Sequence, residues 1–263
     1  MKIAVLTSNH YRHIYFANRL AEQFEVAIVI AEEKAFNPSS NAKNEEENEI
    51  ITKHLALREE EEERTFQERN FKSTNVQAIS SNEINSPETL SLLIASGAEY
   101  LCVFGTGLLK KDLVTAFEGK IINMHLGLSP FYRGSGTNFF PVCNNEPEYC
   151  GVTIHHLDLG IDSGEIITRG RARIYQDDNI HSLGNRIIKV GTFLMIETLK
   201  GIAKGEIKTA AKQNLSEGKT YFRKDFNAKS VEVAYNNIAN GLFSKYDKLQ
   251  YDKLKEVEVY DPK

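Results

Sequence analysis

The chain has 263 residues, of which 41% are hydrophobic and 26% are charged, the composition of a globular protein large enough to bury a full core. Its net charge of −4 argues against a general binder of nucleic acid or anionic membranes, although a local basic groove stays compatible with it. No apolar run is long enough to span a membrane, no secretory signal is recognised, and the three cysteines form no CxxC pair, so a reduced cytoplasm is the expected compartment.

The first 30 residues predict a strand, a helix and a second strand of a parallel sheet. Buried strands are expected at the apolar runs 2–6 and 26–30, with an amphipathic helix at roughly 14–24 between them. The residues from Thr7 to His13 are then expected to form the loop that joins the first strand to the helix. Such a unit almost always has a right-handed crossover.

The segment 31–72 differs from its surroundings because it holds twelve Glu against seven Lys and Arg, a local charge of −5. Apolar residues still recur at Ile51, Leu55, Leu57 and Phe66, which predicts one or two long, solvated helices inserted between strands of the sheet. We interpret the charge run as a solvated helix face. A lid or an oligomer arm is the alternative, and the sequence alone does not support it.

After this insertion, strands and helices alternate again. Further strands are predicted at the apolar runs 76–79, 100–104, 120–123, 150–156 and 165–168. Helices are predicted at 86–97, at roughly 109–117 and at roughly 181–200. The alternation predicts an α/β fold with a doubly wound, mostly parallel sheet.

The densest polar segment follows the strand predicted at 120–123. Asn123 and His125 lie two residues apart at the end of this strand, so their side chains point to the same side. Ligands of doubly wound sheets bind outside the carboxyl ends of the strands, where these two groups can act on one reacting atom. A second polar group, with His155 and Asp162, follows the strand predicted at 150–156.

Taken singly, these residues also have plain structural explanations. Asn123 fits a turn residue that ends a strand, and His125 fits a satisfied loop histidine. A zinc site formed by His125, His155 and Asp162 is the rival for the whole cluster. No HxH or HxxxH spacing on one element supports it, and Asn123 would be an unusual zinc ligand. We therefore expect no metal.

The order of these motifs resembles the folate-dependent formyltransferase family. The shared elements are Asn-x-His, a proline, Arg-Gly, Gly-Val-Thr-x-His and Asp-x-Gly, at residues 123–125, 130, 133–134, 151–155 and 162–164. The family includes glycinamide ribonucleotide, methionyl-tRNA and nucleotide-sugar N-formyltransferases. The resemblance covers roughly residues 98–200 and, more loosely, the first strand–helix–strand unit. It implies a Rossmann-like catalytic domain of residues 1–205, with 31–72 as an insertion and 206–263 as a C-terminal extension.

The resemblance implies a reaction in which an acceptor amine attacks the formyl carbon of 10-formyltetrahydrofolate directly. It gives the catalytic roles to Asn123, His125 and Asp162. An amide and an imidazole stabilise the oxyanion, each by about 3–4 kcal/mol, and a carboxylate raises the pKa of the histidine and relays the proton of the amine. His155 is expected to help order the site. Neither a covalent enzyme intermediate nor a metal is required.

The same resemblance implies two binding regions, a folate pocket and an acceptor site. The residues expected to bind folate are Thr106, Gly107, Leu108, Leu109, Leu157, Asp158 and Leu159. The residues expected to bind the acceptor are Asn9, His10, Tyr11, Arg12, Arg133, Gly134 and Ser135. Leucine walls suit the apolar faces of a pterin. Arg12 suits a diphosphate, and Tyr11 suits a base or a sugar.

Departures from the family pattern reduce the number of acceptor substrates that fit this sequence. The loop after the first strand has no glycine, which argues against the phosphate nest of the glycinamide ribonucleotide enzymes. The roughly 60 residues after the last core helix are too few for the added domain of the methionyl-tRNA enzymes, and no regulatory domain of the hydrolases precedes the first strand. A nucleotide-linked amino sugar fits best. Another small amine, such as glycinamide ribonucleotide, and a non-catalytic folate-binding relative are the alternatives. We expect no nucleic-acid or membrane partner, and a homodimer is suggested by the resemblance only.

Overall fold

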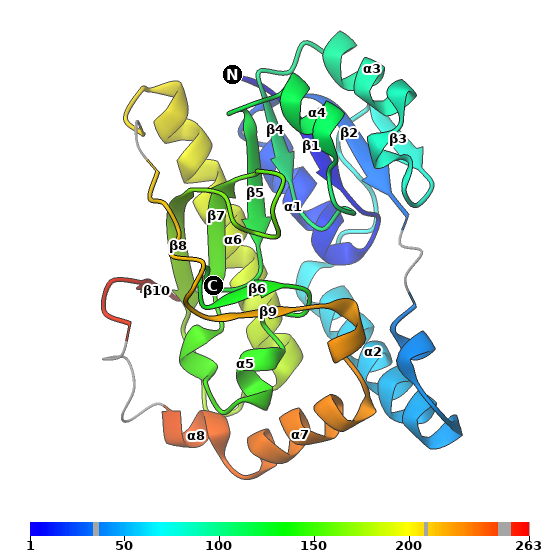
Figure 1. Ribbon diagram of the computed structural model, residues 1–263, viewed down its shortest axis with the longest axis vertical. Coiled ribbons are helices and arrows are strands. Elements are labelled where there is room, and N and C mark those ends of the chain that lie inside the picture. The colour runs from blue at the N-terminus through cyan, green and yellow to red at the C-terminus, as the bar shows by residue number, and fades with distance from the viewer. Residues whose placement is uncertain (34–36, 208–209, 247–253, 263) are drawn as a thin grey trace.

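The fold is described by a computed structural model, which covers residues 1–33, 37–207, 210–246 and 254–262 (Figure 1). Eight strands form one sheet in the order β10-β8-β7-β5-β4-β1-β2-β3. They are β1 (Lys2–Thr7), β2 (Glu25–Glu32), β3 (Val76–Ile79), β4 (Tyr100–Val103), β5 (Ile121–His125), β7 (Val152–His156), β8 (Ile166–Ala172) and β10 (Glu258–Tyr260). Only β7 runs antiparallel to its neighbours among these described strands, so the predicted mostly parallel sheet is confirmed.

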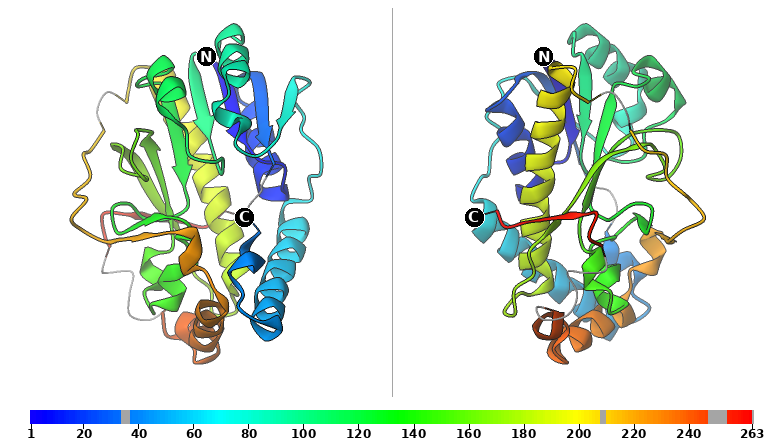
Figure 2. Two further views of the ribbon diagram at one scale, coloured as in Figure 1. Left: turned by 45° about the vertical axis from the view of Figure 1, so that its right-hand side comes forward. Right: turned by 90° about the vertical axis from the view of Figure 1, so that its left-hand side faces the viewer.

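Helices cover both faces of the sheet, as the doubly wound prediction requires (Figure 2). The main ones are α1 (Tyr11–Ala21), α2 (Glu45–Phe66), α3 (Pro87–Ala95), α4 (Lys111–Ala116), α6 (Ile180–Ala203) and α7 (Ala228–Ala239). Alternate residues of β1 explain the two layers. Ile3 and Val5 join the apolar cluster under α1 and α6, whereas Ala4 and Leu6 join the cluster under α3 and α4.

The expected loop from Thr7 to His13 is wrong in length. The helix α1 already begins at Tyr11, so the connection after β1 consists of Ser8, Asn9 and His10. The reason is that the buried side of α1 starts one turn earlier than the apolar pattern suggested. His13 is buried there, and its Nδ1 lies 3.0 Å from the hydroxyl of Thr7.

The charged insertion contains one long helix, α2, and a short 3-10 turn at Pro38–Asn41. The side chain of Asn44 caps the first turn of α2, and three glutamates in that turn complement the positive end of the helix dipole. Ile51 and Phe66 are buried where α2 packs against α1, α6 and α7. Within the glutamate run 59–63, Glu59 and Glu60 are exposed and Glu61 and Glu63 are half-buried, so the expected solvated face is only part of the run, and Glu62 is buried.

The C-terminal extension packs against the rest of the chain at several places. β10 pairs with β8 at the edge of the main sheet, and α7 packs on α2 and α5 (Phe140–Cys143), near α8 (Leu242–Tyr246). A second, two-stranded sheet joins β6 (Tyr132–Gly134) to β9 (Lys219–Tyr221). The boundary near residue 205 stays a prediction. No helix in the described part of the chain is long and apolar enough to cross a membrane.

Candidate active site

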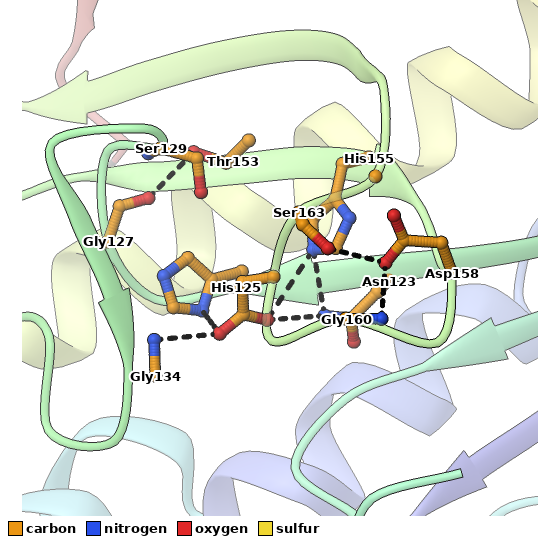
Figure 3. Close-up of polar contacts among 12 residues, drawn as sticks. Asn123, His125, Gly127, Ser129, Gly134, Thr153, His155, Asp158, Gly160 and Ser163 are labelled. Carbon is orange, nitrogen blue, oxygen red and sulfur yellow. Dashed lines mark hydrogen bonds and ion pairs between the residues drawn. The ribbon is translucent and has the colours of Figure 1, made fainter. Parts of the chain in front are cut away.

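Asn123 and His125 lie together at the end of β5 (Figure 3), and the carboxylate of Asp162 meets both side chains. Nδ1 of His125 lies 3.2 Å from Oδ2 of Asp162, and Nδ2 of Asn123 lies 3.5 Å from Oδ1 of the same carboxylate. Asp162 comes from the loop between β7 and β8. This loop reaches β5 because β7 pairs with β5, which places His155 directly opposite Asn123.

His155 orders this cluster through both of its ring nitrogens. Its Nδ1 donates to the carbonyl of His156 at 2.8 Å, so its Nε2 carries the lone pair and accepts from Nδ2 of Asn123 at 3.0 Å. The backbone of Gly164 lies against the same carbonyl of His156, so a Cβ atom at Gly164 would collide with it. His155 therefore fixes the side chain of Asn123 in the direction of Asp162.

His125 is almost fully buried and faces an acceptor at each ring nitrogen. Its Nδ1 meets Asp162, and its Nε2 lies 2.9 Å from the carbonyl oxygen of Tyr132. Only the imidazolium form can donate to both at once. Burial lowers the pKa of His125 below its ordinary value, and Asp162 and the carbonyl of Tyr132 oppose that shift only in part. The ring packs so tightly that a Cβ at Gly127 would lie 2.7 Å from Nε2.

Asp162 is an ionised group held from several sides. Burial by itself would raise the pKa of Asp162, but His125 and the backbone amide of Gly134 oppose this, and the pKa is lowered to about 2. The amide of Gly134 donates to Oδ2 at 2.9 Å. The carboxylate therefore keeps its negative charge beside His125 at any pH well above 2.

The Gly-Val-Thr-x-His motif supports the loop that follows His125. The hydroxyl of Thr153 donates to the carbonyl of Gly127 at 2.7 Å and accepts from the amide of Ser129 at 3.0 Å (Figure 3). A side-chain hydroxyl thus satisfies two buried backbone groups, which keeps this loop against β7.

The two loops predicted to bind folate each present an exposed leucine. Leu108 is 72% exposed and Leu159 is 63% exposed, whereas Leu109 is buried in the apolar cluster on which Leu157 packs. Thr106 is half-buried, and its hydroxyl donates to the carbonyl of Gly107.

Two carboxylates shape these loops. Glu32, at the end of β2, accepts from the amide of Gly107 at 2.5 Å. Asp158 accepts from the amide of Gly160 and the hydroxyl of Ser163, so it holds its own loop together (Figure 3). The sequence reasoning missed Glu32, because a carboxylate that ends a strand carries no signal of the loop it will meet.

The structure divides the predicted acceptor residues into two groups. Arg12 donates to both carboxylate oxygens of Glu62 at 2.6 and 2.8 Å, and Tyr11 lies under the guanidinium of Arg69. Asn9 accepts from the hydroxyl of Ser8 at 3.5 Å, and His10 lies beside His13, with ring centroids 6.2 Å apart. These four residues therefore surround the start of α1, and α2 supplies the partner of Arg12.

The second group lies on the loop after His125. Gly134 binds Asp162, as described above, and the amide of Ser135 donates to the carbonyl of Tyr221 at 2.9 Å. Arg133 donates to the carbonyl of Leu215, and it is near enough to His125 to lower the pKa of that imidazole. In the described part of the chain, no carboxylate pairs with Arg133, and no group of three or more His, Cys, Asp or Glu is arranged to hold a metal.

Comparison with known proteins shows which family this chain resembles. A family model described as formyl transferase matches residues 1–199. The methionyl-tRNA formyltransferase of Solibacter usitatus is 30% identical over 125 residues, which make up 47% of this chain and 40% of that protein. Over the first curated relatives, the chain spans between 38% and 53% of their length.

Solved structures support the same fold. The phosphoribosylglycinamide formyltransferase of Anaplasma phagocytophilum aligns with a TM-score of 0.58 at 18% identity, over 84% of this chain and 98% of that chain. The formyltransferase PseJ of Anoxybacillus kamchatkensis, solved with UDP-4,6-dideoxy-4-formamido-L-AltNAc and tetrahydrofolate, aligns with a TM-score of 0.50 at 17% identity, over 86% of this chain and 87% of that chain. The family model runs from β1 into α6, and the chain therefore belongs to the formyl transferase family.

Proposed function

We propose that this chain transfers a formyl group from 10-formyltetrahydrofolate to the primary amine of a small acceptor. The observation that supports this most strongly is the meeting of Asn123, His125 and Asp162 at the carboxyl end of β5, in a chain of this family. The amine attacks the formyl carbon, negative charge develops on the formyl oxygen, and the bond from the formyl carbon to N10 then breaks, so that tetrahydrofolate leaves with a proton on that nitrogen. Catalysis then depends on donors and charges that already point at this oxygen.

Each of the three groups has a role that its contacts suit. One N–H of Asn123 donates to His155. The same amide nitrogen lies 3.5 Å from Asp162, which is long for a hydrogen bond, so a formyl oxygen can take the place of Asp162 as the acceptor of the second N–H. In its protonated form, His125, held between Asp162 and the carbonyl of Tyr132, places positive charge beside the oxyanion. Asp162 stabilises this imidazolium and relays the proton of the attacking amine, through water, to the leaving nitrogen of tetrahydrofolate.

The formyl donor is proposed to lie between the loops of Leu108 and Leu159. Large apolar side chains that are this exposed suit the faces of a pterin, and backbone groups of the same loops suit its polar edge. PseJ, which shares the fold, was solved with tetrahydrofolate, which agrees with a folate donor.

For the acceptor, we propose a nucleotide-linked amino sugar that is anchored by Arg133. Arg12 is neutralised by Glu62, whereas Arg133 has no carboxylate partner among the described residues and lies near His125. A diphosphate bound there would place an attached sugar amine beside the catalytic groups. Glycinamide ribonucleotide is the second candidate, because a phosphoribosylglycinamide formyltransferase has the same fold.

The test is an acceptor screen with 10-formyltetrahydrofolate, in which released tetrahydrofolate is followed by absorbance. The acceptors are nucleotide-linked 3-amino and 4-amino sugars, glycinamide ribonucleotide and a blank without acceptor. Turnover with an amino sugar alone is the expected result. Turnover in the blank would instead indicate a hydrolase, and failure with every amine would contradict the proposed activity.

A further inference from the structure

Residues 211–221 of the C-terminal extension run along the loops that carry the candidate catalytic groups. At one end, Ala211 and Ile166 exchange two backbone hydrogen bonds of 2.8 Å, which fasten this strap to the start of β8. At the other end, β9 pairs with β6, and Leu215 between them accepts from Arg133. The strap is therefore fixed to the loops on both sides of the site.

Between these two points, the side chain of Gln213 reaches the turn that contains Asp162. Its Nε2 donates to the carbonyl oxygen of Asp162 at 2.9 Å and to that of Gly164 at 2.6 Å. Both partners are acceptors, so only the NH₂ end of the amide can face them. Gln213 thus holds the backbone on either side of Ser163.

Contacts from outside the turn are needed to stabilise its backbone conformation. Asp162 has a φ of 47°, in the left-handed region that a residue with a side chain rarely adopts. Such a residue keeps this conformation only where its surroundings impose it. His125 and Gly134 hold its carboxylate, and Gln213 holds its carbonyl.

We propose that Gln213 is a positioning residue, which sets the orientation of Asp162 toward His125 and makes the C-terminal extension a part of the active site. Gln213 lies beyond the residues 1–199 that carry the family match. Its effect on the rate rests on the proposed function, whereas its effect on the His125–Asp162 pair does not. A displacement of a catalytic group by about 1 Å can lower a rate about 100-fold. Because Gln213 positions Asp162 and does not bind substrate in this proposal, the loss of activity should appear in kcat rather than in KM.

The experiment compares the full wild-type chain with Gln213→Ala and Gln213→Glu. The alanine removes the amide, and the glutamate keeps the length but places a carboxylate against two carbonyl oxygens. Gln77→Glu is the matched control, because Gln77 is exposed on β3 and its amide donates to the neighbouring carbonyl of Ala78. The readouts are kcat, KM, the melting temperature and the pKa of His125 from an NMR titration of its imidazole.

We expect Gln213→Ala to lower kcat about 10-fold and Gln213→Glu to lower it at least as much, with KM for the formyl donor changed less than about twofold. The pKa of His125 should fall in Gln213→Ala, because Asp162 no longer stabilises its imidazolium. Gln77→Glu should match the wild type.

The titration needs no turnover, so the two proposals can fail separately. A lower pKa of His125 in a chain that formylates no amine would support the positioning and contradict the proposed function. A lower melting temperature with kcat and the pKa of His125 unchanged would overturn the positioning, because Gln213 would then be merely structural.

Discussion

Two regions at the carboxyl edge of one sheet carry charged side chains, and they hold them in different ways. After β1, Arg12 binds both oxygens of Glu62, which comes from α2 in the charged insertion. At the end of β5, His125 and Asp162 pair at 3.2 Å, and their remaining polar contacts include the backbone carbonyl of Tyr132 and the backbone amide of Gly134. The first pair joins two helices, whereas the second is enclosed by loops.

The difference shows what an ion pair can be used for. A guanidinium that donates to both oxygens of a carboxylate from another helix already has its hydrogen-bond partner, so its contribution is to dock that helix. A pair that is oriented by backbone groups keeps a fixed direction and can act on a third molecule beside it. Charged residues at a strand end therefore do not define a site until their partners are known.

The largest effect should come from removing the groups at the end of β5. We expect Asn123→Ala and His125→Ala each to lower turnover about 100-fold or more, because each removes a group that stabilises the oxyanion. Steady-state turnover measures this, with circular dichroism to show that the fold survives. Near-normal turnover in either variant would remove that residue from the catalytic set.

The next effect concerns the stability of the docked insertion. Glu62→Gln should lower the free energy of unfolding by about 3 kcal/mol, because it leaves Arg12, with Arg58 beside it, without the buried carboxylate. Urea denaturation measures the change. Glu60→Gln, at an exposed position of the same helix, is the control and should change stability little. Equal effects of the two would mean that the pair contributes nothing to docking.

The same insertion should also make stability depend on pH. Burial, with the charges of His181 and Arg58, lowers the pKa of His54 to about 3, and burial with Arg58 lowers that of His181 to about 4. The hydroxyl of Tyr235 lies 3.3 Å from both rings. The unfolded chain takes up these protons first, so the stabilisation from the neutral histidines is complete above the ordinary pKa of 6.5. It is lost as the pH falls from there toward 4 for His181 and toward 3 for His54.

At pH 5 the loss should be about 2 kcal/mol per histidine. Thermal unfolding at pH 7 and pH 5 measures it in the wild type and in His54→Gln, whose amide can still bond to Tyr235. The variant should lose less stability than the wild type between these two values. An identical loss in both chains would show that His54 is not the titrating group.

The smallest expected effect is on the KM for the acceptor, and it should distinguish Arg133 from Arg12. Arg133→Ala should raise the KM for the acceptor about 10-fold, because it removes the proposed diphosphate ligand. Arg12→Ala should leave this KM unchanged, since Glu62 already binds that guanidinium. Both KM values are measured with one acceptor at a temperature where both variants stay folded. The opposite result would move the acceptor to the start of α1.

Much of this arrangement was predictable because it depends on local patterns. The apolar runs at β1, β2, β4, β5 and β7 and the alternation with helices predicted the doubly wound sheet, which the structure confirms. The spacing of Asn123 and His125 predicted that both would face one side of a strand. The start of α1 was wrong by three residues, because a buried histidine, His13, does not register as apolar in the periodicity.

The sequence by itself determined the fold class, because strand periodicity is a local property of the chain. The order of its motifs indicated the family, and this resemblance, rather than any local pattern, placed Asp162 with Asn123 and His125. Only the tertiary structure decided which of these groups have partners. Glu62 is one of five consecutive glutamates, and nothing local distinguishes it as the partner of Arg12, 50 residues away. Gln213 likewise meets the carbonyl of Asp162 across 51 residues. Such contacts arise when packed helices and strands bring distant segments together, and their geometry follows from the packing as a whole.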